Sequence, residues 1–207
     1  LAPTGDKDPY ALRRHALGIC RLLLEKNLSL SLPELIELAR KQFPQKDVQE
    51  KAKAEDIYAF IIDRLRAYLR DQAVSGKPFT TEEIDAVLSQ SPAQLNDLID
   101  RLTALREFNA LAEAAQLAAA NKRISNILKK NASAIPETCS STLLQVPAEI
   151  ALHQALEKLT PTLTVAYEKR QFVELLKALV ALSAPIDQFF ADVMVMDPNL
   201  ELDRKSV

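Results

Sequence analysis

The amino-acid sequence predicts an all-α fold, a multi-helix bundle divided into two helical subdomains. The good helix formers Leu, Ala, Glu, Lys, Arg and Gln dominate the 207 residues. Aromatic residues make up 5% of the chain, which has three glycines and no Trp. A β-sandwich or β-barrel needs turn glycines and strand-forming aromatic residues, so this composition argues against both. The hydrophobic share of 48% provides a core for one large or two small domains.

Two helices are predicted before residue 44. Asp8 followed by Pro9 predicts an N-cap and a proline at the first helical position, and this helix continues to about Asn27. Its expected buried stripe is Leu12, Ala16, Ile19, Cys20 and Leu23. Ser31 predicts the cap of a second, short helix, which the Phe43-Pro44 pair ends.

A long third helix is predicted from about Asp47 to Gln72. Its buried stripe is expected to be Ile57, Ile61, Leu65, Tyr68 and Leu69. The clearest break in the chain follows at residues 75–78, where Gly76 and Pro78 combine two turn-forming residues. Thr80 with Glu83 then forms a capping-box pattern, which predicts a short helix to Leu88.

A further helix is predicted to begin at Ser91-Pro92. Its apolar stripe is Leu95, Leu98, Ile99, Leu102 and Leu105. We place the boundary between the two subdomains here, which gives residues 1–90 and residues 91–207.

The second subdomain is expected to contain more helices after a stretch rich in alanine, residues 110–120. Residues 131–147 are polar, contain two prolines and form the longest predicted loop. Three helices are expected beyond it, at residues 147–159, 163–182 and 185–195.

The sequence contains no recognisable catalytic or metal-binding pattern. Its three glycines are too far apart to form a phosphate-binding loop, and His15 and His153 lie in no metal-binding motif. His153 is more simply a surface or core histidine, and the Asp97/Asp100 pair is expected to be helix-start charge or exposed. Cys20 is expected to be buried among apolar residues, and the two cysteines form no disulfide framework, which favours a reducing, cytoplasmic compartment.

The most informative segment is residues 119–130. Wound as a helix, it places Ile124, Ile127 and Leu128 on one side. The other side carries Lys122, Arg123, Asn126, Lys129 and Lys130. No acidic residue occurs between Glu113 and Glu137, although the whole chain has a net charge of −2. This cationic face either contacts a polyanion or is an ordinary solvated helix face. Asn121, on the apolar side, is expected to be buried.

Three stretches of the sequence resemble a known family. They are residues 3–14, residues 118–128 with the sequence AAANKRISNIL, and Phe189-Phe190 followed by residues 193–196. In this order they resemble the C-terminal part of the β subunit of bacterial glycyl-tRNA synthetase. The chain departs from the family pattern at Ala191 and in residues 202–204. The resemblance also implies that the sequence is part of a longer protein.

The resemblance implies that different parts of the chain belong to different domains. Residues 1–90 would continue from a His-Asp-like helical domain, whose metal signature is not in this sequence, so phosphohydrolase activity is not carried over. Residues 91–207 would be a helical anticodon-binding domain like those of arginyl- and cysteinyl-tRNA synthetases. The family enzyme is an α₂β₂ assembly whose α subunit holds the class II catalytic site. ATP and Mg²⁺ would therefore be used by the assembled enzyme and bound by no residue of this segment.

The leading hypothesis is therefore that the segment binds glycine tRNA, chiefly its anticodon arm, alongside the catalytic α subunit in the cytoplasm, with no membrane or DNA partner. Lysine and arginine contact phosphates, whereas Asn and Arg can also read unpaired bases. Phe189, Phe190, Met194 and Met196 are expected to be core. The alternative is a non-catalytic helical scaffold for subunit assembly, which the low pI of about 5.8 favours modestly.

Overall fold

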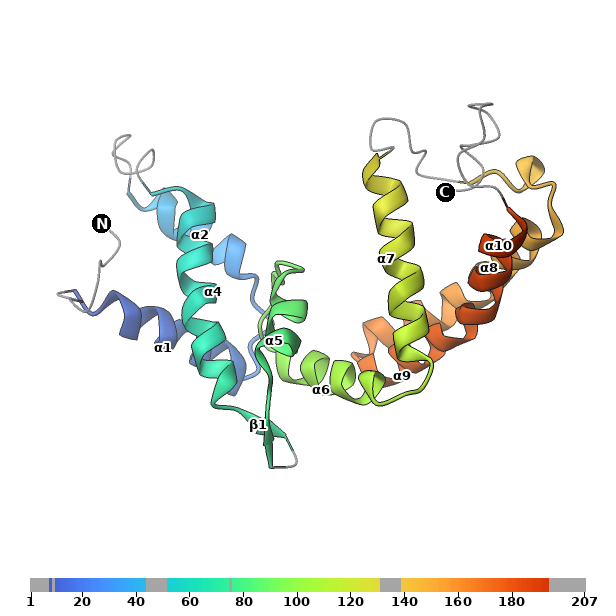
Figure 1. The fold of residues 1–207 in the computed structure, drawn as a ribbon. Helices are drawn as coiled ribbons and strands as arrows, with labels where there is room; N and C mark the ends of the chain where they lie inside the picture. Colours follow the sequence, from blue (N-terminus) through green and yellow to red (C-terminus); the bar gives the residue numbers. More distant parts are fainter. Residues whose placement is uncertain (1–7, 9, 44–51, 75, 131–138, 194–207) are drawn as a thin grey trace. The chain divides into compact units, whose positions relative to one another are not determined.

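The computed structural model describes residues 8, 10–43, 52–74, 76–130 and 139–193 of the chain. The described residues are mostly helical, as predicted (Figure 1). Backbone contacts divide the chain into two compact units, residues 1–103 (unit 1) and residues 104–207 (unit 2). The division falls within the helix α6 (Leu98–Asn109) and therefore after the position predicted from the sequence. The boundary between residues 90 and 91 stays a prediction about how functions are divided along the chain.

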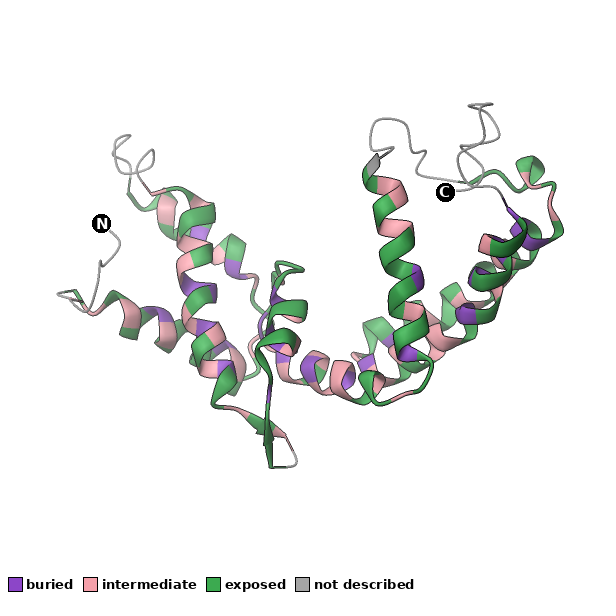
Figure 2. Cartoon of the chain, viewed as in Figure 1, coloured by how far each residue is buried: buried purple, intermediate pink, exposed green. Residues whose placement is uncertain are grey.

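Unit 1 is a small bundle organised around one central helix, α4 (Ala54–Arg70), which contacts three others. These are α1 (Leu12–Glu25), α2 (Leu32–Lys41) and α5 (Thr81–Leu88). Its core includes the fully buried side chains of Cys20, Leu32, Leu65, Leu69, Ile84, Leu95, Leu98 and Leu102. The predicted stripe of α4 is confirmed, because Ile61, Leu65 and Leu69 are buried and its other two members are half-buried (Figure 2). The stripe of α1 is only partly buried, since Leu12 and Ile19 are exposed.

Two of the three predicted N-caps of unit 1, Ser31 and Thr80, are confirmed, whereas the N-cap of α1 is Ala11 and not Asp8. The Ser31 hydroxyl accepts a hydrogen bond from the Glu34 N–H at 3.4 Å and caps α2. At the start of α5, the Thr80 hydroxyl accepts from the Glu83 N–H at 3.2 Å, and the Glu83 carboxylate accepts from the Thr80 N–H at 2.8 Å. This reciprocal pair satisfies backbone donors that the first helical turn leaves free.

Three helices begin later than the sequence predicts, namely α1, α6 and, as described below, α4. Helix α1 begins at Leu12, and the Asp8 carboxylate still accepts hydrogen bonds from the Leu12 and Arg13 N–H groups, at 2.8 and 3.0 Å. Helix α6 begins at Leu98 and not at Pro92, because the preceding backbone is used elsewhere. The Leu32 N–H donates to the Ala93 carbonyl at 2.7 Å, and Ser31 and Gln94 form an isolated antiparallel bridge.

The predicted break at residues 75–78 falls at a short antiparallel hairpin. In this hairpin, β1 (Ala73–Val74) pairs with β2 (Lys77–Pro78). Gly76 has a φ of +75°, a conformation that L side chains rarely adopt. The long helix predicted from Asp47 begins at Ala54, and residues 47–51 lie outside the described residues.

Unit 2 is built by four α-helices and two short 3₁₀ turns among its described residues. The helices are α7 (Ala114–Lys130), α8 (Pro147–Glu168), α9 (Phe172–Leu179) and α10 (Ser183–Asp192). The 3₁₀ turns are η1 (Ser141–Leu143) and η2 (Val180–Leu182). Helix α10 packs against both α7 and α8, and α9 packs against α8. Leu182, Ile186 and Ala120 form one apolar cluster of this unit.

The helix boundaries of unit 2 differ from the prediction in two places. Helix α8 continues through Pro161 to Glu168, and the chain turns only at Arg170, whose φ is +56°. Proline inside a helix removes one backbone donor, and here the Thr160 and Thr164 hydroxyls donate to carbonyls one turn earlier, at 2.7 and 3.0 Å. Helix α10 begins at Ser183, so Pro185 lies in its first turn instead of marking a joint.

No helix of the described residues combines the length and apolar character required to cross a membrane.

Candidate nucleic-acid interface

Helix α7 carries the cationic face that the sequence predicts. Lys122, Arg123, Asn126 and Lys129 are all exposed. Exposed positions recur along α7 in Figure 2. Lys130 belongs to the same helix, but its side chain lies outside the described part of the chain. Within that described part, no carboxylate lies within ion-pairing distance of Lys122, Arg123 or Lys129. The positive charge of this face therefore remains available to an anionic partner.

The opposite face of α7 packs against the other helices of unit 2. Ala120 is buried, and Ile124 packs with it against Leu182 and Ile186. Ile127 and Leu128 are half-buried, so the predicted separation of an apolar from a cationic face is confirmed. The prediction that Asn121 is buried is wrong, because this residue is exposed. Helix α7 packs mainly against α10 and η2, and Asn121 is not among the residues of the apolar cluster that joins them.

Arg123 makes a contact that the sequence does not reveal. Its Cζ atom lies 3.8 Å from the centroid of the Phe190 ring on α10. Phe190 in turn packs edge-to-face with Phe189, at 5.4 Å between ring centroids and an interplanar angle of 69°. Phe189 is buried, as predicted, and Phe190 is half-buried. Met194 and Met196, which we also expected in the core, lie outside the described residues.

Glu149 and His153 of unit 2 have structural partners. The Glu149 carboxylate accepts hydrogen bonds from the Gln145 and Val146 N–H groups, at 2.9 and 3.0 Å, and so caps the start of α8. His153 Nε2 lies 3.5 Å from the Glu157 carboxylate, one turn along the same helix. His15, in unit 1, is exposed. Among the described residues, no group of His, Cys, Asp and Glu side chains is arranged to hold a metal ion.

Two further polar residues of unit 1 have structural roles. Asp97 is buried and pairs with Arg101 at 2.8 Å, so it is a helix-start charge but does not lie on an exposed face. Cys20 is fully buried, as predicted, and this burial raises the pKa of its thiol to about 11. The thiol is therefore protonated and unreactive at neutral pH.

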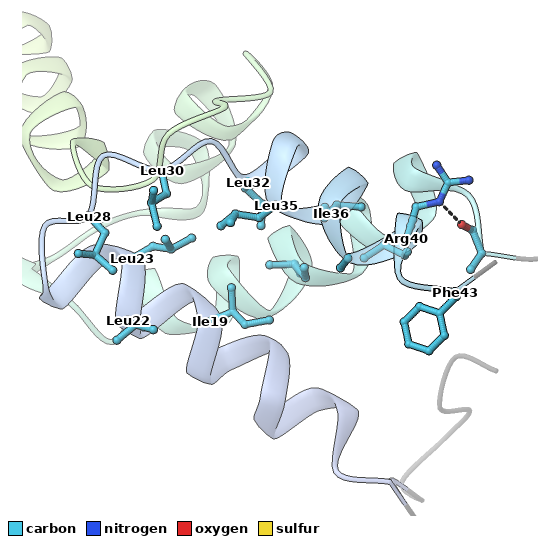
Figure 3. Close-up of a pocket in the computed structure, with 14 residues that line it drawn as sticks. Ile19, Leu22, Leu23, Leu28, Leu30, Leu32, Leu35, Ile36, Arg40 and Phe43 are labelled. Atoms are coloured by element: carbon cyan, nitrogen blue, oxygen red, sulfur yellow. Dashed lines mark hydrogen bonds between the residues drawn. The ribbon is translucent and has the colours of Figure 1, made fainter. Parts of the chain in front are cut away.

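Unit 1 also contains an open apolar groove of about 500 Å³ between α1, α2 and α4 (Figure 3). Exposed apolar side chains line its opening, among them Ile19, Leu22, Leu30 and Phe43. Arg40 is the one charged residue among the described residues that line it, and the Arg40 Nε donates to the Ala52 carbonyl at 2.9 Å. Sequence reasoning missed this groove because apolar residues at helical spacing look the same whether another helix covers them or not. Among the described residues, no set of polar groups converges on this groove.

Comparison with known proteins indicates the class of helical domain that carries this cationic face. A family model described as the DALR anticodon binding domain matches residues 117–205, a range that includes the cationic face of α7. Unit 2 therefore contains an anticodon-binding helical domain. A second family model, described as the glycyl-tRNA synthetase beta subunit, matches residues 1–89.

Curated relatives agree over nearly the whole chain. The glycine–tRNA ligase beta subunit of Dechloromonas aromatica (strain RCB) is 48% identical over 204 residues, which are 98% of this chain and 28% of the relative. That of Nitrosomonas eutropha is 44% identical over 214 residues, covering 98% of this chain and 29% of the relative. That of Leptothrix cholodnii is 46% identical over 204 residues, with 98% and 28% covered. The chain is thus similar to glycine–tRNA ligase beta subunits along nearly its whole length and spans about 28% of the length of these relatives.

Proposed function

We propose that this chain binds the anticodon arm of glycine tRNA through the cationic face of α7, on behalf of a glycine–tRNA ligase. The observation that carries this proposal is the exposed cationic face of Lys122, Arg123 and Lys129, which has no ion-pair partner among the described residues and lies within a segment that matches an anticodon-binding domain. Lys130 lies on the same helix and is included in the proposed face. Lysine and arginine attract the phosphates of the anticodon stem and loop.

Asn126 provides the hydrogen-bond acceptor that the lysines lack. Its side-chain amide offers both donors and an acceptor, so it can pair with the edge of an unpaired base. Asn126 is exposed and lies on α7 among the cations, where phosphate contacts would orient a loop toward it. Phosphate contacts would thus supply affinity, and Asn126 would contribute to the choice of anticodon.

The chemistry of aminoacylation is assigned to another subunit. The described residues contain no group that could hold a metal ion, and the sequence has no glycine-rich phosphate loop. We propose that ATP and Mg²⁺ are used by the catalytic α subunit of an α₂β₂ enzyme. The expected place of this activity is the cytoplasm, where tRNA is charged for translation.

A binding experiment with charge-reversal variants tests this proposal. Lys122→Glu and Lys129→Glu should each weaken the binding of glycine tRNA, because a phosphate contact becomes a repulsion. Lys158→Glu is the matched control, since Lys158 is exposed on α8 and changes the net charge equally. Equal affinities of all three variants and the parent would refute the assignment of α7 to the interface.

The choice of tRNA tests the reading of the anticodon separately. Glycine tRNA with substituted anticodon bases should bind the chain more weakly than the unmodified tRNA. Equal affinity for both would show that the chain contacts phosphates without reading bases. If the chain binds no tRNA, the alternative applies: the unit is a scaffold whose cationic helix faces an acidic protein surface.

A further inference from the structure

Arg123 and Phe190 form a two-layer stack at the surface of unit 2. The distance of 3.8 Å between the Arg123 Cζ and the ring centroid is that of two carbon atoms in van der Waals contact. An edge-on guanidinium would place a nitrogen between its Cζ and the ring and would lengthen this distance. The guanidinium plane therefore lies flat on the aromatic ring. The Arg64 guanidinium, whose Cζ lies 5.1 Å from the centroid of Phe60, is not in such close contact.

This stack is anchored on its inner side and open on its outer side. Phe190 packs against Phe189 and against the apolar clusters around Ile186 and Ala148. Arg123 is exposed, and no described carboxylate forms an ion pair with it. A planar, charged group is thus held by a partly buried ring and presents its second face to solvent.

We infer that the Arg123–Phe190 stack is a platform on which an unpaired base of the bound RNA stacks. This inference rests on the proposed function and refines it, because it assigns Arg123 to a base and not to a phosphate. Unpaired bases in RNA complexes stack on aromatic rings and on arginine guanidinium planes. The inner ring holds the guanidinium in one orientation before RNA arrives, so less side-chain freedom is lost on binding. Asn126, one turn further along α7, lies where it can reach the edge of the stacked base.

Substitution by lysine distinguishes a phosphate contact of Arg123 from base stacking on Arg123. A lysine keeps the positive charge but has no planar group, so it can replace a phosphate contact and cannot replace a stacking platform. Loss of a base-stacking side chain typically weakens single-stranded nucleic acid binding by about 5- to 150-fold. We expect Arg123→Lys to weaken binding at least about fivefold, at the low end of that range.

The test uses the 207-residue chain and the anticodon stem-loop of glycine tRNA. A series of stem-loops, each with one abasic nucleotide in the loop, identifies the base that stacks. Arg123→Lys should bind the intact stem-loop more weakly than the parent does, with an unchanged salt dependence. With one particular abasic stem-loop, the parent and the variant should bind equally, because the base that distinguishes them is gone.

Arg64→Lys is the matched control, since it removes another arginine that lies over a phenylalanine, in unit 1, and should leave binding unchanged. The inference is overturned if Arg123→Lys binds like the parent. It is equally overturned if the variant loses the same factor with every abasic stem-loop, which would show that Arg123 only supports the fold. In both cases, weaker binding by Lys122→Glu and Lys129→Glu would leave the proposed function standing, whereas no binding by the parent would refute both.

Discussion

The salt dependence of tRNA binding gives a quantitative test of how many phosphates α7 contacts. Lys122 and Lys129 are exposed and have no carboxylate partner among the described residues, so each can neutralise one phosphate. For single-stranded nucleic acid, each such contact contributes about −0.7 to the slope of log K against log salt concentration. Replacing both lysines by glutamine should therefore make the slope less steep by about 1.4.

This change in slope is large enough to measure by fluorescence anisotropy with labelled glycine tRNA. Between 50 and 200 mM salt, the affinity of the parent should fall roughly sevenfold more than that of the Lys122→Gln/Lys129→Gln variant. Lys158→Gln, on α8, is the control and should keep the parent's slope. A double variant with the parent's slope would refute the reasoning, because it would show that neither lysine displaces counterions from the RNA.

Three further predictions concern the fold and reactivity of unit 1. Thr80→Ala should lower the free energy of unfolding by about 1 kcal/mol, because it removes the capping box of α5; unchanged urea unfolding would contradict this. Leu65→Ala should cost about 2–5 kcal/mol in the same assay, since Leu65 is fully buried in α4, and a loss below 1 kcal/mol would contradict its core position. The pKa of Cys20, raised to about 11, keeps its thiol protonated below that pH, so iodoacetamide at pH 8 should label the exposed Cys139 and spare Cys20. Mass spectrometry showing equal labelling of both cysteines would overturn that prediction.

Features set by neighbouring residues could be predicted from the sequence. The caps at Ser31 and Thr80 were found because the side chain and the backbone group that it satisfies lie three residues apart. The two faces of α7 follow from helical periodicity alone, which is why Lys122 and Lys129 are exposed as expected.

Features set by distant residues could not be predicted in this way. Helix α6 begins late because Ala93 pairs with Leu32, a residue remote in the sequence. Similarly, the exposure of Asn121 depends on which part of α7 its neighbours cover, and Arg123 meets Phe190 only because α10 packs on α7. The continuation of α8 through Pro161 could not be predicted either, because proline usually breaks helices and this one is accommodated within α8.

The contact between α7 and the anticodon arm is tested most directly by a ribonuclease footprint of glycine tRNA on the 207-residue chain. We predict that the parent protects the anticodon loop and that the Lys122→Glu/Lys129→Glu variant, at the same concentration, does not. Protection confined to other parts of the tRNA, or equal protection of the loop by parent and variant, would contradict the account.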